Sequence, residues 1–263
     1  MILDRFKLDD RVALVTGAGK GIGRGIALAF AEAGADVVCA ARTAADLEAT
    51  AKAVRERGRR ALPVVTDVMK SADLERLVEA SVRELGRLDL LVNNAGGTAP
   101  RPALQTSEAF FENALRFNVT QAFLLTRLAV PKMLETAGGG AVVNISSRSS
   151  DMVQTAFVAY AAGKAALNMI TRNLAAEFAP KVRVNAISVG GVGTQALEVV
   201  LTNDALRRQF EENTPMGRPG TVEDIAACAL YLASPAASWV TGKIFQVDGG
   251  TEAPAMSVPT PPL

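Results

Sequence analysis

A tyrosine and a lysine spaced four residues apart, Tyr160 and Lys164, are the pair in this sequence best suited to acid–base chemistry at a carbonyl group. On a helix, residues at i and i+4 share one face, so the ammonium would lie beside the phenol. A tyrosine hydroxyl has a reference pKa of about 10, and a nearby positive charge favours the tyrosinate. We therefore expect Lys164 to lower the pKa of Tyr160, although the same spacing is common on any amphipathic helix.

The chain contains no histidine. This absence excludes a Ser-His-Asp or Cys-His catalytic arrangement, and it argues against a catalytic zinc because such sites nearly always use histidine. We expect no metal site. Proton transfer must therefore come from Tyr, Lys, Ser, Asp, Glu or a cofactor. The two cysteines, Cys39 and Cys228, lie in apolar segments and are expected to be free thiols.

A glycine-rich segment follows the first predicted strand and precedes a predicted helix, with the sequence Thr16-Gly17-Ala18-Gly19-Lys20-Gly21-Ile22-Gly23. Glycines permit a tight turn and let backbone N–H groups approach a pyrophosphate, while the helix N-terminus favours its negative charge. A glycine cluster alone is weak evidence, but this one has the strand–turn–helix context that the function requires. We expect a dinucleotide to be bound by Gly17, Gly19, Lys20, Gly21, Ile22 and Gly23.

The end of the second predicted strand indicates which dinucleotide is bound. An acidic residue there would bond the ribose 2′-hydroxyl of NAD, but this sequence has Ala40-Ala41-Arg42-Thr43. Arg42 can pair with a 2′-phosphate, and Lys20 can approach the same group. Because this segment has no competing carboxylate, we expect NADP(H) to be preferred, with NAD(H) also possible.

Short apolar runs, which are typical of strands, alternate along the chain with longer amphipathic segments, which are typical of helices. The near-continuous hydrophobicity of the short runs predicts strands buried on both faces and hence a parallel sheet. The predicted strands are residues 11–16, 36–41, 61–65, 89–92, 141–146, 182–187 and 244–247. The predicted helices are residues 21–34, 44–58, 72–85, 108–135, 158–178 and 222–233.

This alternation predicts an α/β Rossmann fold, a doubly wound seven-stranded parallel sheet with right-handed crossovers and helices on both faces. No linker or repeat interrupts the chain, so residues 1–263 are expected to form a single domain. Residues 253–263 contain Pro254, Pro259, Pro261 and Pro262, and we expect no regular structure there. This tail would either fray or extend over a neighbouring subunit.

Together these motifs resemble the short-chain dehydrogenase/reductase family. The resemblance covers residues 10–250, and it is strongest to bacterial 3-oxoacyl-carrier-protein reductases and hydroxysteroid dehydrogenases. Besides the glycine segment, it rests on Asn93-Asn94-Ala95-Gly96, Tyr160-Ala161-Ala162-Gly163-Lys164 and Val247-Asp248-Gly249-Gly250. Two positions depart from the family pattern. Gly163 stands where serine is usual, and Val189 replaces the proline before Gly190.

The resemblance implies roles for further residues. Ser147 and Asn118 match the family's catalytic serine and asparagine. Ser147 should orient the substrate oxygen, Asn118 should support a water relay to Lys164, and Lys164 should also hold the nicotinamide ribose. The other positions implied to contact the cofactor are Asp67, Val68, Asn94, Ala95, Gly96, Gly190 and Thr194.

The resemblance thus implies an oxidoreductase that transfers a hydride between NADP(H) and a carbonyl or secondary alcohol, of the 3-oxoacyl or hydroxysteroid kind, with Tyr160 as general acid and base. One alternative is a non-catalytic NADP(H)-binding regulator, because a fold alone never proves activity. A second is an epimerase or dehydratase of the family's extended branch, whose chains are longer.

We expect residues 97–101, 148–157 and 189–215 to form the substrate pocket, with the last segment closing as a lid. An apolar wall suited to a lipid-like or alicyclic ketone would come from Ser149, Met152, Val153, Phe157, Leu197 and Val200. Arg101 or Arg148 would be available to attract an acidic group, but both are expected to be exposed to solvent.

The net charge of +1 creates no field that favours nucleic acid or a membrane surface. No apolar stretch has the length of a bilayer span, and residues 1–10 lack a signal-peptide core. We therefore expect a cytoplasmic protein whose partner is a small-molecule carbonyl or alcohol. Residues 114–132 and 158–178 have broad apolar faces, and the family commonly packs these helices between subunits, which implies a homotetramer.

Overall fold

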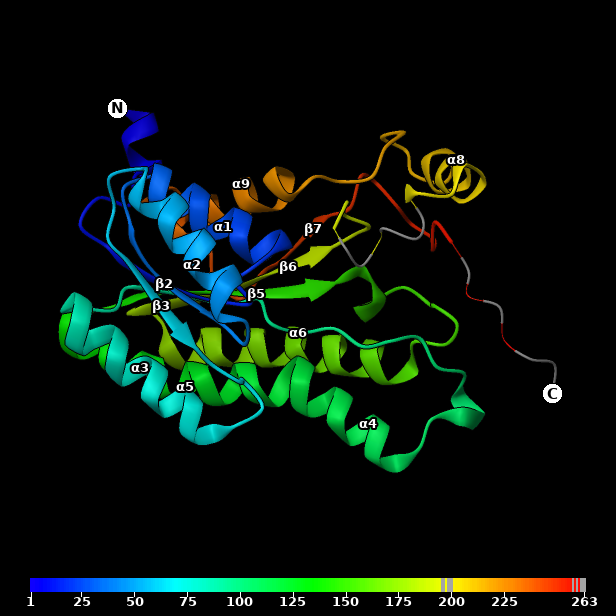
Figure 1. Ribbon diagram of the computed structural model, residues 1–263, viewed down its shortest axis with the longest axis horizontal. Coiled ribbons are helices and arrows are strands. Elements are labelled where there is room, and N and C mark those ends of the chain that lie inside the picture. Colours follow the sequence, from blue (N-terminus) through cyan, green and yellow to red (C-terminus); the bar gives the residue numbers. More distant parts are fainter. Residues whose placement is uncertain (195–196, 198–200, 257, 259, 261–263) are drawn as a thin grey trace.

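The structure is a computed structural model that describes residues 1–194, 197, 201–256, 258 and 260. At its centre lies a seven-stranded sheet of order β3-β2-β1-β4-β5-β6-β7, in which every neighbouring pair is parallel (Figure 1). The strands are β1 Val12–Thr16, β2 Asp36–Ala41, β3 Ala61–Val65, β4 Leu90–Asn93, β5 Gly140–Ser147, β6 Val182–Val189 and β7 Ile244–Val247. The predicted fold class and all seven predicted strands are confirmed.

Helices cover both faces of the sheet, and each layer buries its own hydrophobic cluster (Figure 1). On one face lie α1 Gly21–Glu32, α2 Ala44–Arg55 and α9 Val222–Ala233; on the other lie α3 Ser71–Leu85, α5 Gln121–Ala137 and α6 Val158–Phe178. Beside them lie α4 Glu108–Leu115 and α8 Asp204–Glu212, and short 3₁₀ turns occupy Ile2–Phe6, Ala103–Gln105, Arg148–Ser150 and Pro235–Ala237. Phe30 lies in the first cluster and Leu125 in the second, and both side chains are fully buried.

The strand order reverses between β1 and β4, which creates a crevice at the carboxyl edge of the sheet. Ligands of doubly wound sheets bind at such a switch point. Because all strands are parallel, the residues that follow β1, β4, β5 and β6 meet at this one edge. The glycine segment, Asn94, Ser147 and Gly190 are therefore neighbours in space although they are far apart in the chain.

The helix expected over residues 108–135 is interrupted by a π-helical turn, Arg116–Thr120, between α4 and α5. Within it, the Asn118 side chain donates a hydrogen bond to the backbone oxygen of Ala114 at 2.9 Å. Single π-helical turns are frequent at functional sites. A single-period hydrophobic pattern does not reveal the extra residue of such a turn, so the sequence predicted one uninterrupted helix.

Helix α8 lies inside the segment that the sequence assigned to a lid, and it was not predicted. Its charged sequence buries only Phe210. Asn203 is the N-cap of this helix, and asparagine is a residue type that commonly caps helices. Its side chain accepts hydrogen bonds from the backbone N–H groups of Ala205 and Leu206. Because α8 buries a single residue, the segment lacks the broad apolar face by which the other helices were predicted.

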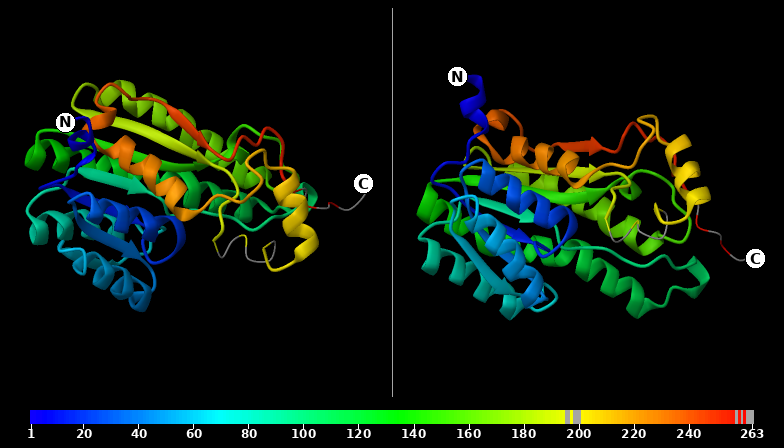
Figure 2. Two further views of the ribbon diagram at one scale, coloured as in Figure 1. Left: turned by 90° about the horizontal axis from the view of Figure 1, so that it is seen from above. Right: turned by 45° about the horizontal axis from the view of Figure 1, so that its top comes forward.

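The C-terminal segment packs against its own chain. It passes beside α8 (Figure 2), where the Asn213 side chain donates to the backbone oxygen of Ala255 at 3.1 Å. Thr155 donates to the backbone oxygen of Val258 at 2.7 Å. As expected, the described residues of this segment form no helix or strand. Fraying, one of the two expectations, is wrong for Ala255, which is 9% exposed.

Candidate active site

A cavity of about 1270 Å³ opens at the carboxyl edge of the sheet. Its volume exceeds the roughly 300–1,000 Å³ of common small-molecule sites, so it has room for two ligands side by side. Of the predicted site residues, only Gly23 and Asn118 lie outside its lining. Those that line it are Gly17, Gly19, Lys20, Gly21, Ile22, Arg42, Asp67, Val68, Asn94, Ala95, Gly96, Ser147, Tyr160, Lys164, Gly190 and Thr194.

The glycine segment forms a bare backbone cradle at the start of α1. Gly17 and Gly21 have positive φ angles of 66° and 52°, which glycine adopts at little cost. A Cβ on Gly23 would collide with the Gly17 carbonyl oxygen and the Asn94 side chain, so Gly23 serves packing rather than contact. The hydroxyl of Thr16 accepts from the backbone N–H of Asn94 at 3.0 Å and thereby ties the cradle to β4. The residues present fit a dinucleotide pyrophosphate.

A carboxylate stands where the sequence analysis assumed none. Asp46, in the first turn of α2, lines the cavity near Arg42, and its Oδ2 lies 3.3 Å from Lys20 Nζ. Asp46 lies several residues after the predicted strand end. In the sequence it resembles an ordinary acidic residue in the first turn of a helix. Arg42 makes no ion pair with any residue that the structure describes. Lys20 is thus partly neutralised, while Arg42 is available to a ligand.

Tyr160 and Lys164 lie one turn apart on α6, as their spacing predicted, and Lys164 Nζ is 5.7 Å from the Tyr160 ring centre. Lys164 is 3% exposed and donates to the backbone oxygen of Ile145 at 2.8 Å. Burial lowers the pKa of Lys164 to about 8. Burial also raises the pKa of Tyr160, and a hydrogen bond with Ser147 opposes this only in part. The expected lowering of the Tyr160 pKa is therefore wrong, because desolvation of the phenol dominates.

Ser147 ends β5, where its hydroxyl is held by a short chain of hydrogen bonds. The Ser147 oxygen accepts from the backbone N–H of Ser149 at 3.2 Å and donates to the Ser149 hydroxyl at 3.3 Å. The Ser149 hydroxyl in turn donates to Gln154 Oε1 at 2.7 Å. Sequence reasoning assigned Ser149 to an apolar wall and missed Gln154, because nothing in the spacing of a polar loop signals this contact.

Asn118 is 1% exposed and faces the Gly96–Gly97 segment instead of the cavity. Its Oδ1 accepts from the backbone N–H of Gly97 at 2.8 Å. A Cβ on Gly96 would lie 3.0 Å from Asn118 Oδ1 and 3.1 Å from Lys164 Nζ. Asn118 and Lys164 thus approach the same glycine, which places the asparagine beside the lysine rather than beside a substrate.

Of the two departures from the family pattern, the one at Gly163 has a packing reason. A Cβ on Gly163 would lie 3.1 Å from Asn118 Cβ, so a glycine there lets α6 approach the π-helical turn closely. A Cβ on Gly190 would lie 2.6 Å from Asp248 Cα, which demands glycine after Val189. Val189 itself pairs with Ser147 and Val247 in the sheet.

The substrate side of the cavity is lined by apolar side chains, which are Met152, Phe157, Leu197, Phe210, Met256 and Val258. Met152, Phe157 and Leu197 were predicted. Val153 was expected in this wall, but it is 90% exposed and lies outside the lining. Val200 lies outside the described residues.

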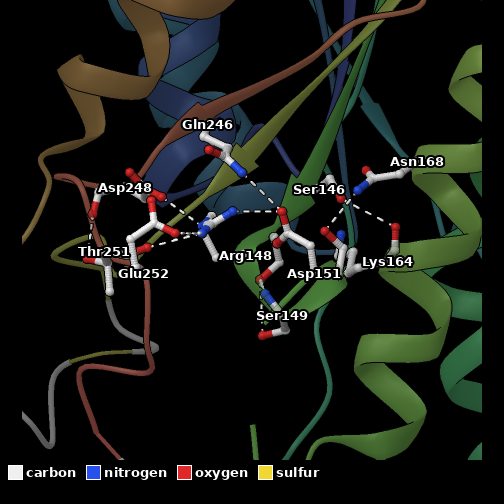
Figure 3. Close-up of polar contacts among 12 residues, drawn as sticks. Ser146, Arg148, Ser149, Asp151, Lys164, Asn168, Gln246, Asp248, Thr251 and Glu252 are labelled. Atoms are coloured by element: carbon white, nitrogen blue, oxygen red, sulfur yellow. Dashed lines mark hydrogen bonds and ion pairs between the residues drawn. The ribbon is translucent and has the colours of Figure 1, made fainter. Parts of the chain in front are cut away.

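The two arginines considered for the substrate side differ. Arg101 is exposed as expected, and its guanidinium lies 4.3 Å from the Phe110 ring centre. Arg148 was also expected to be exposed, and this is wrong. It is 6% exposed because it forms ion pairs at 2.7 Å with Asp151 and Asp248 (Figure 3).

None of the described helices is long and apolar enough to span a bilayer.

Comparison with known proteins places this geometry among reductases and dehydrogenases. A family model described as enoyl-(acyl carrier protein) reductase matches residues 17–252. Over 263 residues the chain is 50% identical to an uncharacterized oxidoreductase of Mycobacterium tuberculosis, a match that covers 100% of each chain.

Two similar solved structures hold nicotinamide cofactors. One is a 7α-hydroxysteroid dehydrogenase complexed with NADH and 7-oxo glycochenodeoxycholic acid, with a TM-score of 0.91 and 37% identity, covering 95% of this chain and 97% of that one. The other is a gluconate 5-dehydrogenase from Burkholderia cenocepacia in complex with NADP and tartrate, with a TM-score of 0.89 and 32% identity, covering 95% and 98%.

Proposed function

The chain belongs to the short-chain dehydrogenase/reductase family, whose oxidoreductases act on alcohols and ketones, and we propose that it interconverts a bulky apolar ketone and its secondary alcohol with NADP(H). The observation that carries this proposal is one continuous cavity. It joins the glycine cradle to Ser147, Tyr160 and Lys164 and then to an apolar wall. The 7-oxo steroid conjugate held by the similar dehydrogenase supports a large, mostly apolar substrate.

In the proposed reaction, a bound nicotinamide supplies the hydride during reduction and accepts it during oxidation. Ser147 donates a hydrogen bond to the substrate oxygen and thereby orients the carbonyl. Tyr160 gives its hydroxyl proton to that oxygen during reduction and takes it back during oxidation. The Lys164 ammonium, which has few competing partners, stabilises the tyrosinate that forms.

Lys164 has a second role in the proposal, and Asn118 supports it. Lys164 would also hold the ribose of a bound nicotinamide cofactor, and water near Asn118 would return a proton to Lys164. This route is consistent with the placement of Asn118 and Lys164 at the same Gly96 backbone.

A turnover screen tests the function directly. Ketones of increasing apolar size are offered with NADPH and with NADH, and absorbance at the nicotinamide band reports the rate. We expect the highest kcat/KM for a bulky apolar ketone with NADPH. Absence of turnover across the whole panel would favour a non-catalytic NADP(H)-binding regulator, and turnover with NADH alone would contradict the proposed coenzyme.

The coenzyme preference depends on the charges at the adenosine end. Arg42→Ala should weaken NADPH binding about 10- to 100-fold, because a charge-assisted hydrogen bond contributes about 1.5–3 kcal/mol, and should change NADH binding little. Asp46→Asn should tighten NADPH binding, since it removes a negative charge that competes for Lys20. Fluorescence titration with both coenzymes measures these effects.

The matched control for this pair is Arg55→Ala. Arg55 lies on α2, as Asp46 does, but it pairs with Glu48 at 2.6 Å and lies outside the cavity lining. Arg55→Ala should leave the dissociation constants for NADPH and NADH unchanged. An Arg42→Ala protein that keeps the wild-type ratio of NADPH to NADH affinity would refute the assignment of Arg42.

We further propose that the chain acts in the cytoplasm as a single-domain subunit of a homotetramer. Large apolar side chains that are partly exposed on α5 and α6 support the assembly. They are Phe123, Leu134, Val158 and Met169, which are 38–53% exposed. A subunit mass of 27.5 kDa in solution would contradict this assembly.

A further inference from the structure

A buried arginine follows the catalytic serine directly. Arg148 has a side chain that is only 7% exposed, although it begins the 3₁₀ turn after β5 and lines the cavity. Its guanidinium contacts three separate parts of the chain (Figure 3). Nη1 lies 2.7 Å from Asp151 Oδ2, Nε lies 2.7 Å from Asp248 Oδ2, and Nη2 donates to the backbone oxygen of Thr251 at 3.1 Å.

These partners connect the catalytic strand to the end of the chain. Asp151 belongs to the loop after β5, and Gln246 of β7 also donates to it at 3.1 Å. Asp248 follows β7 and lies against Gly190 of the cofactor side. Thr251, which is 7% exposed, begins the C-terminal segment. Arg148 is thus the point at which residues 148–157, hereafter the serine loop, meet the last strand and the C-terminal segment.

Beyond Thr251 the chain continues along the substrate side of the cavity. Pro254, Ala255, Met256 and Val258 line it. Two hydrogen bonds fix this segment from opposite sides. Asn213 of α8 donates to the backbone oxygen of Ala255, and Thr155 of the serine loop donates to that of Val258. The described residues of 251–258, hereafter the C-terminal wall, therefore close the space between the serine loop and α8.

We propose that Arg148 is a positioning residue that holds the C-terminal wall against the substrate cavity, so that this wall selects for a bulky apolar substrate. The proposal builds on the proposed function, since it assigns a specificity element to the same site. The planar guanidinium reaches Asp151, Asp248 and Thr251 at once, and its Nη2 also lies 3.7 Å from Glu252 Oε2. A lysine ammonium is a compact point charge on a flexible stem, so it cannot reproduce the three directions.

A half-buried arginine offers a comparison. Arg183, on β6, donates to the backbone oxygens of Leu232 at 2.8 Å and Ser234 at 3.2 Å. It also ties a strand to later parts of the chain, but it lies outside the cavity lining. Replacing either arginine by lysine removes a comparable set of hydrogen bonds. Only Arg148→Lys should affect the C-terminal wall.

The first test needs no turnover. Hydrogen–deuterium exchange of the peptide that spans residues 251–258 is compared among wild type, Arg148→Lys and Arg183→Lys, each as the full chain. We expect at least about tenfold faster exchange in Arg148→Lys and wild-type exchange in Arg183→Lys. Unchanged exchange in Arg148→Lys, or equal acceleration in both variants, would overturn the positioning role whether or not the protein reduces ketones.

The second test addresses selectivity with a small and a bulky apolar ketone. Arg148→Lys should raise KM for the bulky ketone about tenfold, with a much smaller change in kcat and an unchanged dissociation constant for NADPH. A chain that ends at Glu252 should show the same rise in KM for the bulky ketone. It tests the selectivity role if Arg148→Lys does not fold. Retention of the wild-type ratio of the two KM values by the shortened chain would overturn the selectivity role. Failure of the proposed function itself would show separately, as absence of turnover by wild type.

Discussion

Replacing Tyr160 by phenylalanine should lower kcat by about 10²- to 10⁴-fold while the protein still binds NADPH, because general acid–base catalysis contributes about this much. The change removes one hydroxyl from the cavity. The ring keeps its packing on Phe157, whose centre lies 6.0 Å away, and the Ser147 hydroxyl keeps its bonds with Ser149. Steady-state turnover and fluorescence titration with NADPH separate the two effects.

The chain supplies a matched control for this change, because Tyr231 is its only other tyrosine. Tyr231 lies on α9 beside Phe6 and Phe245, away from the cavity lining. Tyr231→Phe should leave kcat near the wild-type value. If Tyr160→Phe retained more than a tenth of wild-type turnover, the proton donor would have to be a different group.

Replacing Lys164 by methionine should also abolish most turnover, because the tyrosinate would lose its stabilising charge. Its second effect concerns stability. In the folded protein Lys164 is buried, and its pKa falls from 10.5 to about 8, so the folded state carries a desolvation cost at neutral pH that the unfolded chain does not. Methionine removes this cost, together with the hydrogen bond to Ile145.

The pH dependence isolates the cost of the buried charge. Below pH 8 both states of the wild type are protonated, and the cost is constant. Between about pH 8 and 10.5 the folded state has lost the proton while the unfolded chain keeps it. Lys164 therefore makes the free energy of unfolding of the wild type rise with pH in this range. The stability of Lys164→Met relative to wild type should therefore fall by about 3 kcal/mol across this window, at 1.36 kcal/mol per pKa unit.

Denaturant unfolding at pH 7.5 and pH 10.5 measures this difference, because all other titrations are common to both proteins. Lys181→Met, at an exposed position, is the control and should show no such change with pH. A stability difference for Lys164→Met that stays constant between the two pH values would mean that the folded protein keeps Lys164 charged across this range, so that burial does not lower its pKa.

The sequence predicted those structural features that depend on the spacing of neighbouring residues. Strand–helix alternation predicted the sheet and its layers, because hydrophobic period and turn residues act over a few neighbouring positions. The glycine segment predicted the cradle for the same reason. The i, i+4 spacing placed Tyr160 and Lys164 on one face of α6, and the absence of histidine restricted which groups can transfer a proton.

Contacts between distant parts of the chain could not be read in this way. Arg148 looked like a surface residue because its carboxylate partner Asp248 follows a strand that is far away in the sequence. The pairing of Asp46 with Lys20 joins two successive helix starts. The pKa of Tyr160 was misjudged because desolvation depends on every group that surrounds the phenol, and not only on the neighbour one turn away.

By itself, the sequence determined the fold class, the glycine cradle and the placement of Tyr160 and Lys164 on one helix face, since each follows from backbone geometry and side-chain type within a short segment. Only the tertiary structure decided which charges are buried, how the π-helical turn aims Asn118, and that the C-terminal wall lines the cavity. Burial and ion pairing depend on which segments meet after folding, and that information is spread over the whole chain.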